Sequence, residues 1–293
     1  MSFRKILCPI DFSPGSLKAM VTAARIAKAH DCELVVAHAW YLASTAVSGE
    51  FLYPVELVKG VIEDNDRALA SAVEEARKVG ATRVSSKMID GQPWVKLVEV
   101  AEADPAIDLI VIGTHGRTGI SRVFLGSVAE MVVRHAPCPV LAIPHEGEPT
   151  PFARILCPID FSESSRLALD LALALDPIPD RTVTLLHIIE PPRIYGGESA
   201  MNVHPGLGGE SQKLLETWGA AAIAKQPAKL SAFVRIGRPS TQVLAVLGED
   251  NAFDLVAMGS HGRTGLQRML LGSVAERVVR HAGRPVLVVR ARR

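Results

Sequence analysis

The chain repeats two of its own phrases, and this repetition constrains the fold more than any other feature. The phrase ILCPIDFS occurs at Ile6–Ser13 and again at Ile155–Ser162, 149 residues later. A glycine-rich phrase, GTHGRTGISRVFLGS, begins at Gly113 and returns as GSHGRTGLQRMLLGS from Gly259. Internal similarity over such a distance predicts two domains of the same fold.

The similarity between the halves is uneven along the chain. Residues 113–144 and 259–290 agree at 21 of 32 positions, whereas the middle segments barely align. With 293 residues in all, we predict domains at 1–146 and 152–293, joined through the phrase HEGEPTPFA. Because agreement gathers around the glycine-rich phrases, these phrases are the first candidates for a functional role.

Strand and helix patterns alternate along each half. In the first half the apolar runs that predict strands are Ile6–Ile10, Leu34–Ala39, Val84–Ile89, Ile107–Ile112 and Val140–Ile143. Helices are expected after the N-cap Ser13, over Asp64–Val79, from Pro93, and over Ser127–His135. We therefore expect an α/β protein: two doubly wound domains, each a five-stranded, mainly parallel sheet with helices on both faces. Ligands of such sheets bind beyond the carboxyl ends of the strands, where the strand order reverses.

One segment differs between the halves. Tyr41–Gly60 and Pro191–Glu210 follow the second strand of each half and hardly resemble each other. Each is expected to be a loop, either an ordinary surface connection or a lid over a site.

Composition excludes several kinds of protein. The formal net charge is +1, so no overall field attracts nucleic acid or an anionic membrane. Apolar runs stay well below eighteen residues, and the opening MSFRKILCPIDF lacks the apolar core of a signal peptide, so a cytoplasmic location is expected. The cysteines at 8, 32, 138 and 157 form no C-x-x-C pair and are expected to be buried thiols rather than disulfides or metal ligands.

The glycine-rich loop has the form G-x-x-G, nine residues, then G-S. Its last two residues, Gly126–Ser127 and Gly272–Ser273, stand where a helix is expected to begin. Free N–H groups at a helix N-terminus bind phosphate, and the serine hydroxyl could either donate to a phosphate oxygen or cap the helix. Arg117 and Arg263 lie inside the loop and could offset phosphate charge.

A structural turn between strand and helix is the alternative interpretation of this loop. The loop is neither a G-x-x-x-x-G-K-[ST] motif nor G-x-G-x-x-G, and it does not follow the first strand. Its presence in both halves favours a phosphate site.

Other repeated polar residues lie at predicted strand ends. Asp11 and Asp160 could accept from a ribose hydroxyl or an adenine amine, or could cap the next helix. His38 and His187 are expected to be packed, leaving Ala39 and Ile188 to offer backbone groups to a base. His115 and His261 are candidates for phosphate contact, and His135 and His281 for a role at a helix C-terminus.

Taken together, these residues resemble the universal stress protein family, with two such domains in tandem. The resemblance rests on CPIDFS, the histidine of the second strand, the glycine loop and the closing phrase RPVLVVR. It covers nearly the whole chain and implies an adenine nucleotide alpha hydrolase-like, Rossmann-like fold. Members with this loop resemble ATP binders, so it implies one site per domain for ATP, or ADP or AMP, with Mg²⁺ held through the phosphates and no direct protein ligand.

The expected nucleotide-binding residues are these: Pro9, Asp11, Ala39, Gly113, His115, Gly116, Arg117, Gly126, Ser127, Val128, Pro158, Asp160, Ile188, Gly259, His261, Gly262, Arg263, Gly272, Ser273 and Val274. The family's last strands pair in dimers. The resemblance therefore implies an intramolecular pseudo-dimer through Val140–Ile143 and Val286–Val289, and a possible homodimer of tandem chains.

Two functions remain open. The first is a nucleotide-dependent regulatory or stress-response protein, with neither nucleic acid nor membrane as partner. The second is a slow ATPase or phosphotransferase at the same sites, although the loop itself contains no Asp, Glu or Lys to act as base. A related synthetase would need an S-G-G-x-D-S loop, which is absent, and a scaffold with empty pockets is the last alternative.

Overall fold

The structure is a computed structural model of the whole chain. It describes residues 2–41, 55–114, 125–191, 205–224, 226–250, 252–261 and 271–290. The chain divides into two compact units, Ser2–Pro149 and Thr150–Arg293.

The described part of the first unit contains five strands, all parallel to their neighbours in the order β3-β2-β1-β4-β5. The strands are β1 (Lys5–Pro9), β2 (Glu33–Trp40), β3 (Arg83–Asp90), β4 (Ile107–Gly113) and β5 (Val140–Ile143). The helices are α1 (Pro14–His30), α2 (Val55–Val79), α3 (Pro93–Ala103) and α4 (Ser127–His135). The predicted fold class is confirmed.

The second unit repeats this arrangement, with the order β8-β7-β6-β9-β10 among its described residues and parallel pairing throughout. Its strands are β6 (Arg154–Ile159), β7 (Thr182–Ile189), β8 (Lys229–Ile236), β9 (Leu255–Gly259) and β10 (Val286–Val289). Its helices are α5 (Glu163–Ala174), α6 (Pro205–Ile223), α7 (Pro239–Glu249) and α8 (Ser273–His281).

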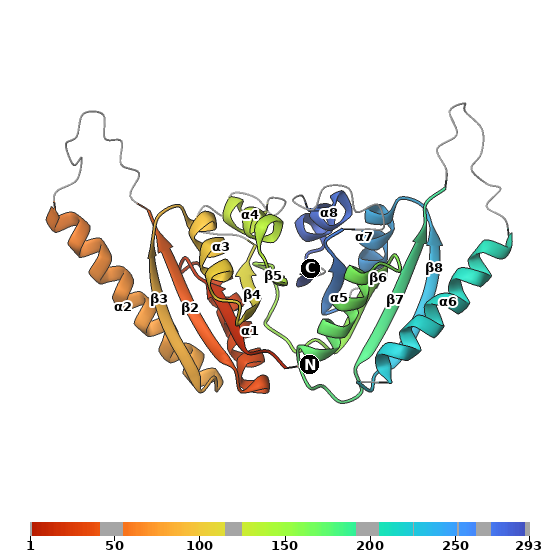
Figure 1. Cartoon of the computed structure of the whole chain (residues 1–293), viewed down its shortest axis with the longest axis horizontal. Coiled ribbons are helices and arrows are strands. Elements are labelled where there is room, and N and C mark those ends of the chain that lie inside the picture. Colours follow the sequence, from red (N-terminus) through yellow and green to blue (C-terminus); the bar gives the residue numbers. More distant parts are fainter. Residues whose placement is uncertain are drawn as a thin grey trace, which may run out of the picture. The chain divides into compact units, whose positions relative to one another are not determined.

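Helices cover both faces of each sheet because the direction in which successive strands are added reverses once. From β1 to β3 the strands are added toward one edge, and from β4 onward toward the other. Right-handed crossovers then place α1 and α2 on one face and α3 and α4 on the opposite face. The packing agrees, since α1 contacts α2 and α3 contacts α4 (Figure 1).

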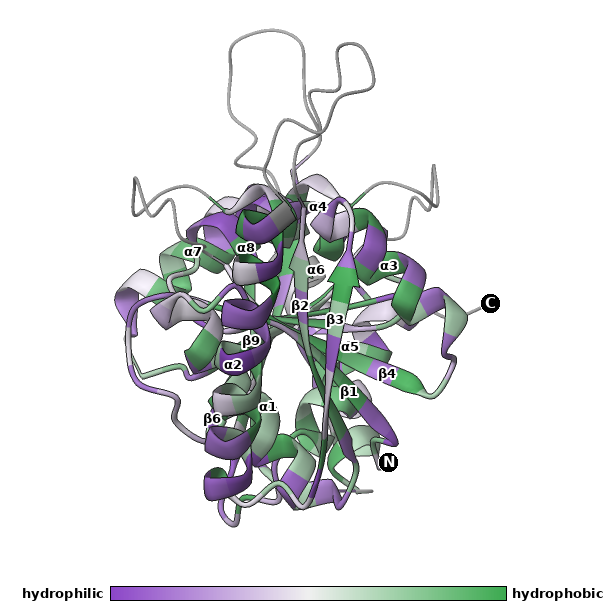
Figure 2. Cartoon of the chain, turned by 90° about the vertical axis from the view of Figure 1, so that its left-hand side faces the viewer, coloured by the Kyte–Doolittle hydropathy of each residue, from purple (hydrophilic) through white to green (hydrophobic). Residues whose placement is uncertain are grey.

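The central strands are apolar because both of their faces are covered. Five of the seven residues of β4 are buried, and only its second and last residues are partly exposed. The outer helix α2 is amphipathic instead, with Leu69, Val73 and Ala76 buried one or two turns apart. In Figure 2 the ribbon of α2 is mostly purple, whereas β1 is mostly green.

The two segments that differ between the halves are more helical than predicted. Helix α2 begins at Val55 rather than at Asp64, and α6 already begins at Pro205, inside the segment assigned to a loop. Leu57 and Val61, in the first turns of α2, are exposed, so no burial pattern marks this part of the helix. Residues 42–54 and 192–204 of these segments lie outside the described residues.

The four cysteines are free and buried, as predicted. Burial raises the pKa of the Cys32 thiol to about 11, which keeps it protonated. The described residues contain no cluster of three or more side chains suited to a metal ion. Within the same residues no helix is both long and apolar enough to span a bilayer.

Candidate functional site

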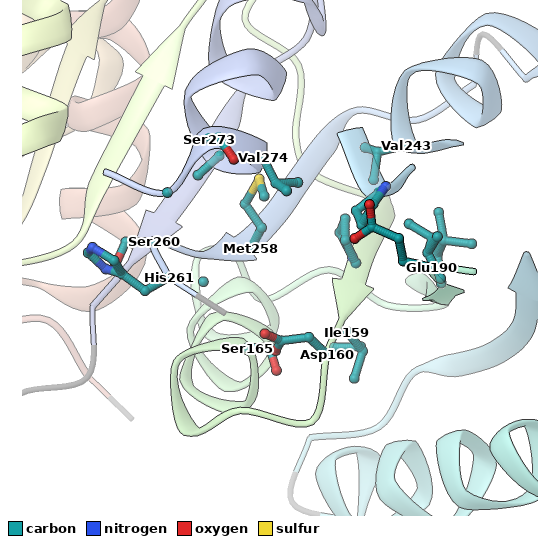
Figure 3. A pocket seen from close by; sticks show the side chains of 17 residues that line it. Ile159, Asp160, Ser165, Glu190, Val243, Met258, Ser260, His261, Ser273 and Val274 are labelled. Carbon is teal, nitrogen blue, oxygen red and sulfur yellow. The ribbon is translucent and has the colours of Figure 1, made fainter. Parts of the chain in front are cut away.

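Each unit has a pocket at the carboxyl ends of its strands, where the strand order reverses. The first pocket has a volume of about 240 Å³ and lies against the ends of β1, β2 and β4 and the starts of α3 and α4. The second has a volume of about 460 Å³ and lies against the corresponding elements β6, β7, β9, α7 and α8 (Figure 3). Open α/β sheets bind ligands at this position.

An aspartate at the end of the first strand is fixed by the helix that follows it. One oxygen of Asp11 accepts from the backbone N–H of Ser13 at 3.1 Å and from its hydroxyl at 2.5 Å. Ser13 in turn caps α1 by accepting from the N–H of Ser16. Asp160 and Ser162 repeat these bonds in the second unit. Neither aspartate caps the next helix itself; each fixes the serine that does, and both line their pockets.

A strained turn follows each aspartate. Phe12 has a φ of 63° and Phe161 a φ of 64°, in the left-handed region that bulky side chains rarely adopt. The Nδ1–H of His38 donates to the carbonyl of Ile10 at 2.8 Å, and its ring stacks on Phe12 with centroids 4.4 Å apart. His187 makes the matching hydrogen bond at 2.7 Å. Both histidines are therefore packed, as expected, and they stabilise the turn that presents the aspartate.

The helices α4 and α8 begin at the pockets without a side-chain cap. The N-cap residues are Gly126 and Gly272, which have no side chain, and no side-chain hydrogen bond from the described residues caps either helix. Ser127 and Ser273 occupy the first helical position, so the proposed capping role of these serines is wrong. The amide groups of the first turn and the serine hydroxyls remain for a ligand.

The glycine at the end of the fourth strand has a packing role. A Cβ on Gly113 would lie 3.0 Å from the backbone of Gly15, at the start of α1. A Cβ on Gly259 would lie 2.4 Å from Oγ of Ser164, which donates to the carbonyl of His261 at 2.8 Å. Helix packing against the strand end therefore requires glycine at both positions, whether or not a ligand approaches them.

His261 lies at the edge of the second pocket, on the side away from Glu190 (Figure 3). Its Nδ1 is 2.9 Å from Oγ of Ser260. Its Nε2 is buried and has no hydrogen-bond partner among the described residues. Burial lowers the pKa of His261, and the charge of Arg290 lowers it further. The imidazole is accordingly neutral at neutral pH.

This lowered pKa predicts that the second unit loses stability in mild acid. In the unfolded chain the histidine has its ordinary pKa of ~6.5, whereas in the folded chain its pKa is lower. As the pH falls from neutral, the unfolded chain therefore takes up a proton before the folded chain does, and the free energy of unfolding decreases until the pH is below the folded pKa. Urea unfolding followed by the fluorescence of Trp218, in a Trp40→Phe and Trp94→Phe background, should show this loss, and His261→Gln should reduce it. Equal acid sensitivity of the two proteins would contradict the prediction, and His145→Gln, an exposed site, is the control.

The pockets bring together the predicted site residues that lie in described segments. These are Pro9, Asp11, Ala39, Gly113, Gly126, Ser127 and Val128 in the first unit, and Pro158, Asp160, Ile188, Gly259, His261, Gly272, Ser273 and Val274 in the second. His115, Gly116, Arg117, Gly262 and Arg263 lie outside the described residues. His135 and His281 are in the last turns of α4 and α8, away from the lining.

The sequence analysis missed the contribution of the third helix of each unit. Pro93 and Leu97 from α3 line the first pocket, and Pro239 and Val243 from α7 line the second. A signal was present, because each proline stands 20 residues before the glycine that ends the fourth strand (93 to 113, 239 to 259). Glu190 was also missed, since its counterpart in the first half is Tyr41.

Fold and pocket together define a tandem α/β protein in which a helix start faces a pocket at the strand ends of each unit. The model of the universal stress protein family matches residues 2–144 and 151–290. The chain belongs to the universal stress protein family.

Relatives agree with this assignment, and a solved structure has the same fold. A universal stress protein of Methanocaldococcus jannaschii is 37% identical over 147 residues, covering 48% of this chain and 82% of that protein. One from Mycobacterium tuberculosis is 29% identical over 310 residues, covering 97% of this chain and 94% of that protein. The crystal structure of a universal stress protein from Archaeoglobus fulgidus has a TM-score of 0.70 at 20% identity, covering 99% of this chain and 98% of that one.

Proposed function

We propose that the protein is a nucleotide-dependent regulatory protein that binds one adenine nucleotide, ATP or its ADP or AMP form, in each unit. The observation that carries this proposal is a helix start capped only by glycine and open to a pocket, found at Gly126 and again at Gly272. Such a helix start combines unsatisfied N–H donors with the positive end of the helix dipole, which suits phosphate.

The rest of each pocket suits a nucleoside. In the second pocket Ile188, Val243 and Met258 supply an apolar wall that a base could pack against. Asp160 is held by Ser162 in an orientation fixed before any ligand arrives, and its position suits a ribose hydroxyl. The backbone of Ile188 would face the base edge. A magnesium ion would be carried by the phosphates, because the described residues offer no ligand cluster for it.

Calorimetric titration of the purified chain with ATP and Mg²⁺ tests the proposal. Two moles of nucleotide per mole of chain are expected, and mass spectrometry of ligand released from native protein identifies the natural nucleotide. If ATP does not bind and no nucleotide co-purifies, the proposal is wrong, and an interaction scaffold with empty pockets is the remaining alternative.

A slow ATPase or phosphotransferase is the second candidate, and His261 favours it. A neutral imidazole beside the start of α8 could accept a proton near the terminal phosphate. Phosphate release that disappears in His261→Gln while ATP binding persists would support this candidate. Release that persists in a variant unable to bind ATP is contamination.

The assembly expected from the resemblance stays a proposal. Val140–Ile143 and Val286–Val289 are the terminal strands in the order of their own units. A strand at the end of a sheet offers unpaired backbone groups to another strand. Sedimentation of the full chain tests this proposal. A pseudo-dimer within one chain should sediment with the mass of one chain, and a homodimer of tandem chains with twice that mass.

A further inference from the structure

The two pockets differ at one charged position. Glu190 follows β7 and lines the second pocket. Its counterpart, 149 residues earlier, is Tyr41, which takes no part in lining the first pocket; both side chains are exposed. Asp160, Gly259, Gly272 and Ser273 match Asp11, Gly113, Gly126 and Ser127 in residue type, whereas Ser260 corresponds to Thr114. Among the described lining residues, the second pocket therefore has one more carboxylate than the first.

Glu190 lies at the end of the pocket opposite the helix start. Figure 3 shows Ser273 and His261 on one side, Glu190 on the other, and Asp160 below and between them. Glu190 is two residues beyond Ile188, so both side chains leave the extended chain toward the same face. The pocket thus has a positive end at the N-terminus of α8 and a negative end at Glu190.

This polarity sets the direction in which a nucleotide can lie. Phosphates are attracted to the start of α8 and repelled by Glu190. The order phosphate, sugar, base then corresponds to Ser273, Asp160 and Glu190. The base end of the ligand meets a group that accepts hydrogen bonds and, as a carboxylate, donates none.

We propose that Glu190 strengthens the preference of the second site for nucleotides whose base carries an exocyclic amino group at position 6, beyond the preference of the first site. An adenine amine donates to the carboxylate. The 6-oxo group of a hypoxanthine base would place an acceptor against an acceptor, which is unfavourable. This inference rests on the proposed nucleotide binding and assigns the base preference of one of its two sites.

The test compares ATP with inosine triphosphate, which differs from ATP at position 6 of the base. Calorimetry on Gly126→Val protein measures the second site, and calorimetry on Gly272→Val protein measures the first. At the second site ATP should bind at least about tenfold more tightly than inosine triphosphate, as expected for a charged hydrogen bond replaced by repulsion. Adding Glu190→Gln should reduce this ratio to within about threefold, because an amide both donates and accepts.

Two controls accompany the measurement. Glu210→Gln, an exposed change in α6 outside the pocket, should leave the ratio unchanged, and Glu190→Gln should leave the first site unchanged. ATP binding with the same ratio before and after Glu190→Gln would overturn the role of Glu190 and leave the proposed function standing. An equal preference at the first site would also overturn it. Failure of both nucleotides to bind wild-type protein would overturn the proposed function itself.

Discussion

Replacing Gly272 with valine is expected to remove nucleotide binding from the second unit and to lower the stoichiometry of the chain from two to one. A Cβ at this position would lie 2.8 Å from the carbonyl oxygen of Ser260, a backbone atom that cannot turn away. The N–H of Gly272 donates to that same oxygen at 2.8 Å, so the start of α8 would have to move. A shift of the amide groups that hold the phosphate should weaken binding by about 100-fold or more.

The corresponding change at Gly126 should act on the first unit alone. The N–H of Gly126 donates to the carbonyl of Thr114 at 2.7 Å, and its φ of −59° and ψ of 142° match the −63° and 143° of Gly272. Gly248→Val is the matched control, because a Cβ on this glycine of α7 would meet nothing within 4 Å. Calorimetry should give one site for each single variant, none for the double variant and two for the control. Two intact sites in Gly272→Val would exclude the start of α8 as the phosphate site.

Replacing Arg181 with methionine should destabilise the second unit by about 3–5 kcal/mol, because several buried carbonyl groups would each lose a donor at about 1–3 kcal/mol apiece. Arg181 is 3% exposed. Its Nε donates to the carbonyl of Phe152 at 3.1 Å, and its other nitrogens donate to carbonyls near the end of α5, including those of Leu173 and Asp176. Methionine would fill part of the space but leave these buried acceptors without a donor.

The fluorescence of Trp218 can isolate this effect. The chain has three tryptophans, and Trp40→Phe with Trp94→Phe leaves only the one in the second unit. Urea unfolding of Arg181→Met in that background should show a greatly lowered midpoint. Arg154→Met is the control: its side chain is 46% exposed and bridges Asp250 at 2.8 Å, so less than about 1 kcal/mol is expected. Similar midpoints for the two variants would contradict the prediction.

Local patterns in the sequence predicted the sheets well because the buried strands are short apolar runs between turn residues. The ends of β5 and α4 were predicted to the residue. The start of α2 could not be predicted this way, since Leu57 and Val61 are exposed and leave no amphipathic signal. The reason for Gly113 also required the fold, because its neighbour Gly15 is remote in sequence.

Site residues that occur in both halves could be predicted from the sequence, whereas those that occur in only one half could not. Asp11 and Gly126 have counterparts in the second half at equivalent positions, so comparing the halves was enough to select them. Glu190 has no acidic counterpart, and only the geometry of the pocket brings it beside the other residues. Whether Ser127 caps its helix depends on which residue begins α4, and sequence patterns do not locate helix ends that closely.

The left-handed phenylalanines limit how either pocket can be re-engineered. Glycine at Phe12 or Phe161 would relieve a backbone cost of about 1–3 kcal/mol. The same change would remove the ring that packs on His38 or His187, and the loop carrying the aspartate would gain freedom. In such a variant the loop that carries the aspartate would no longer be held in place before the ligand binds. Each ligand would have to order this loop on binding.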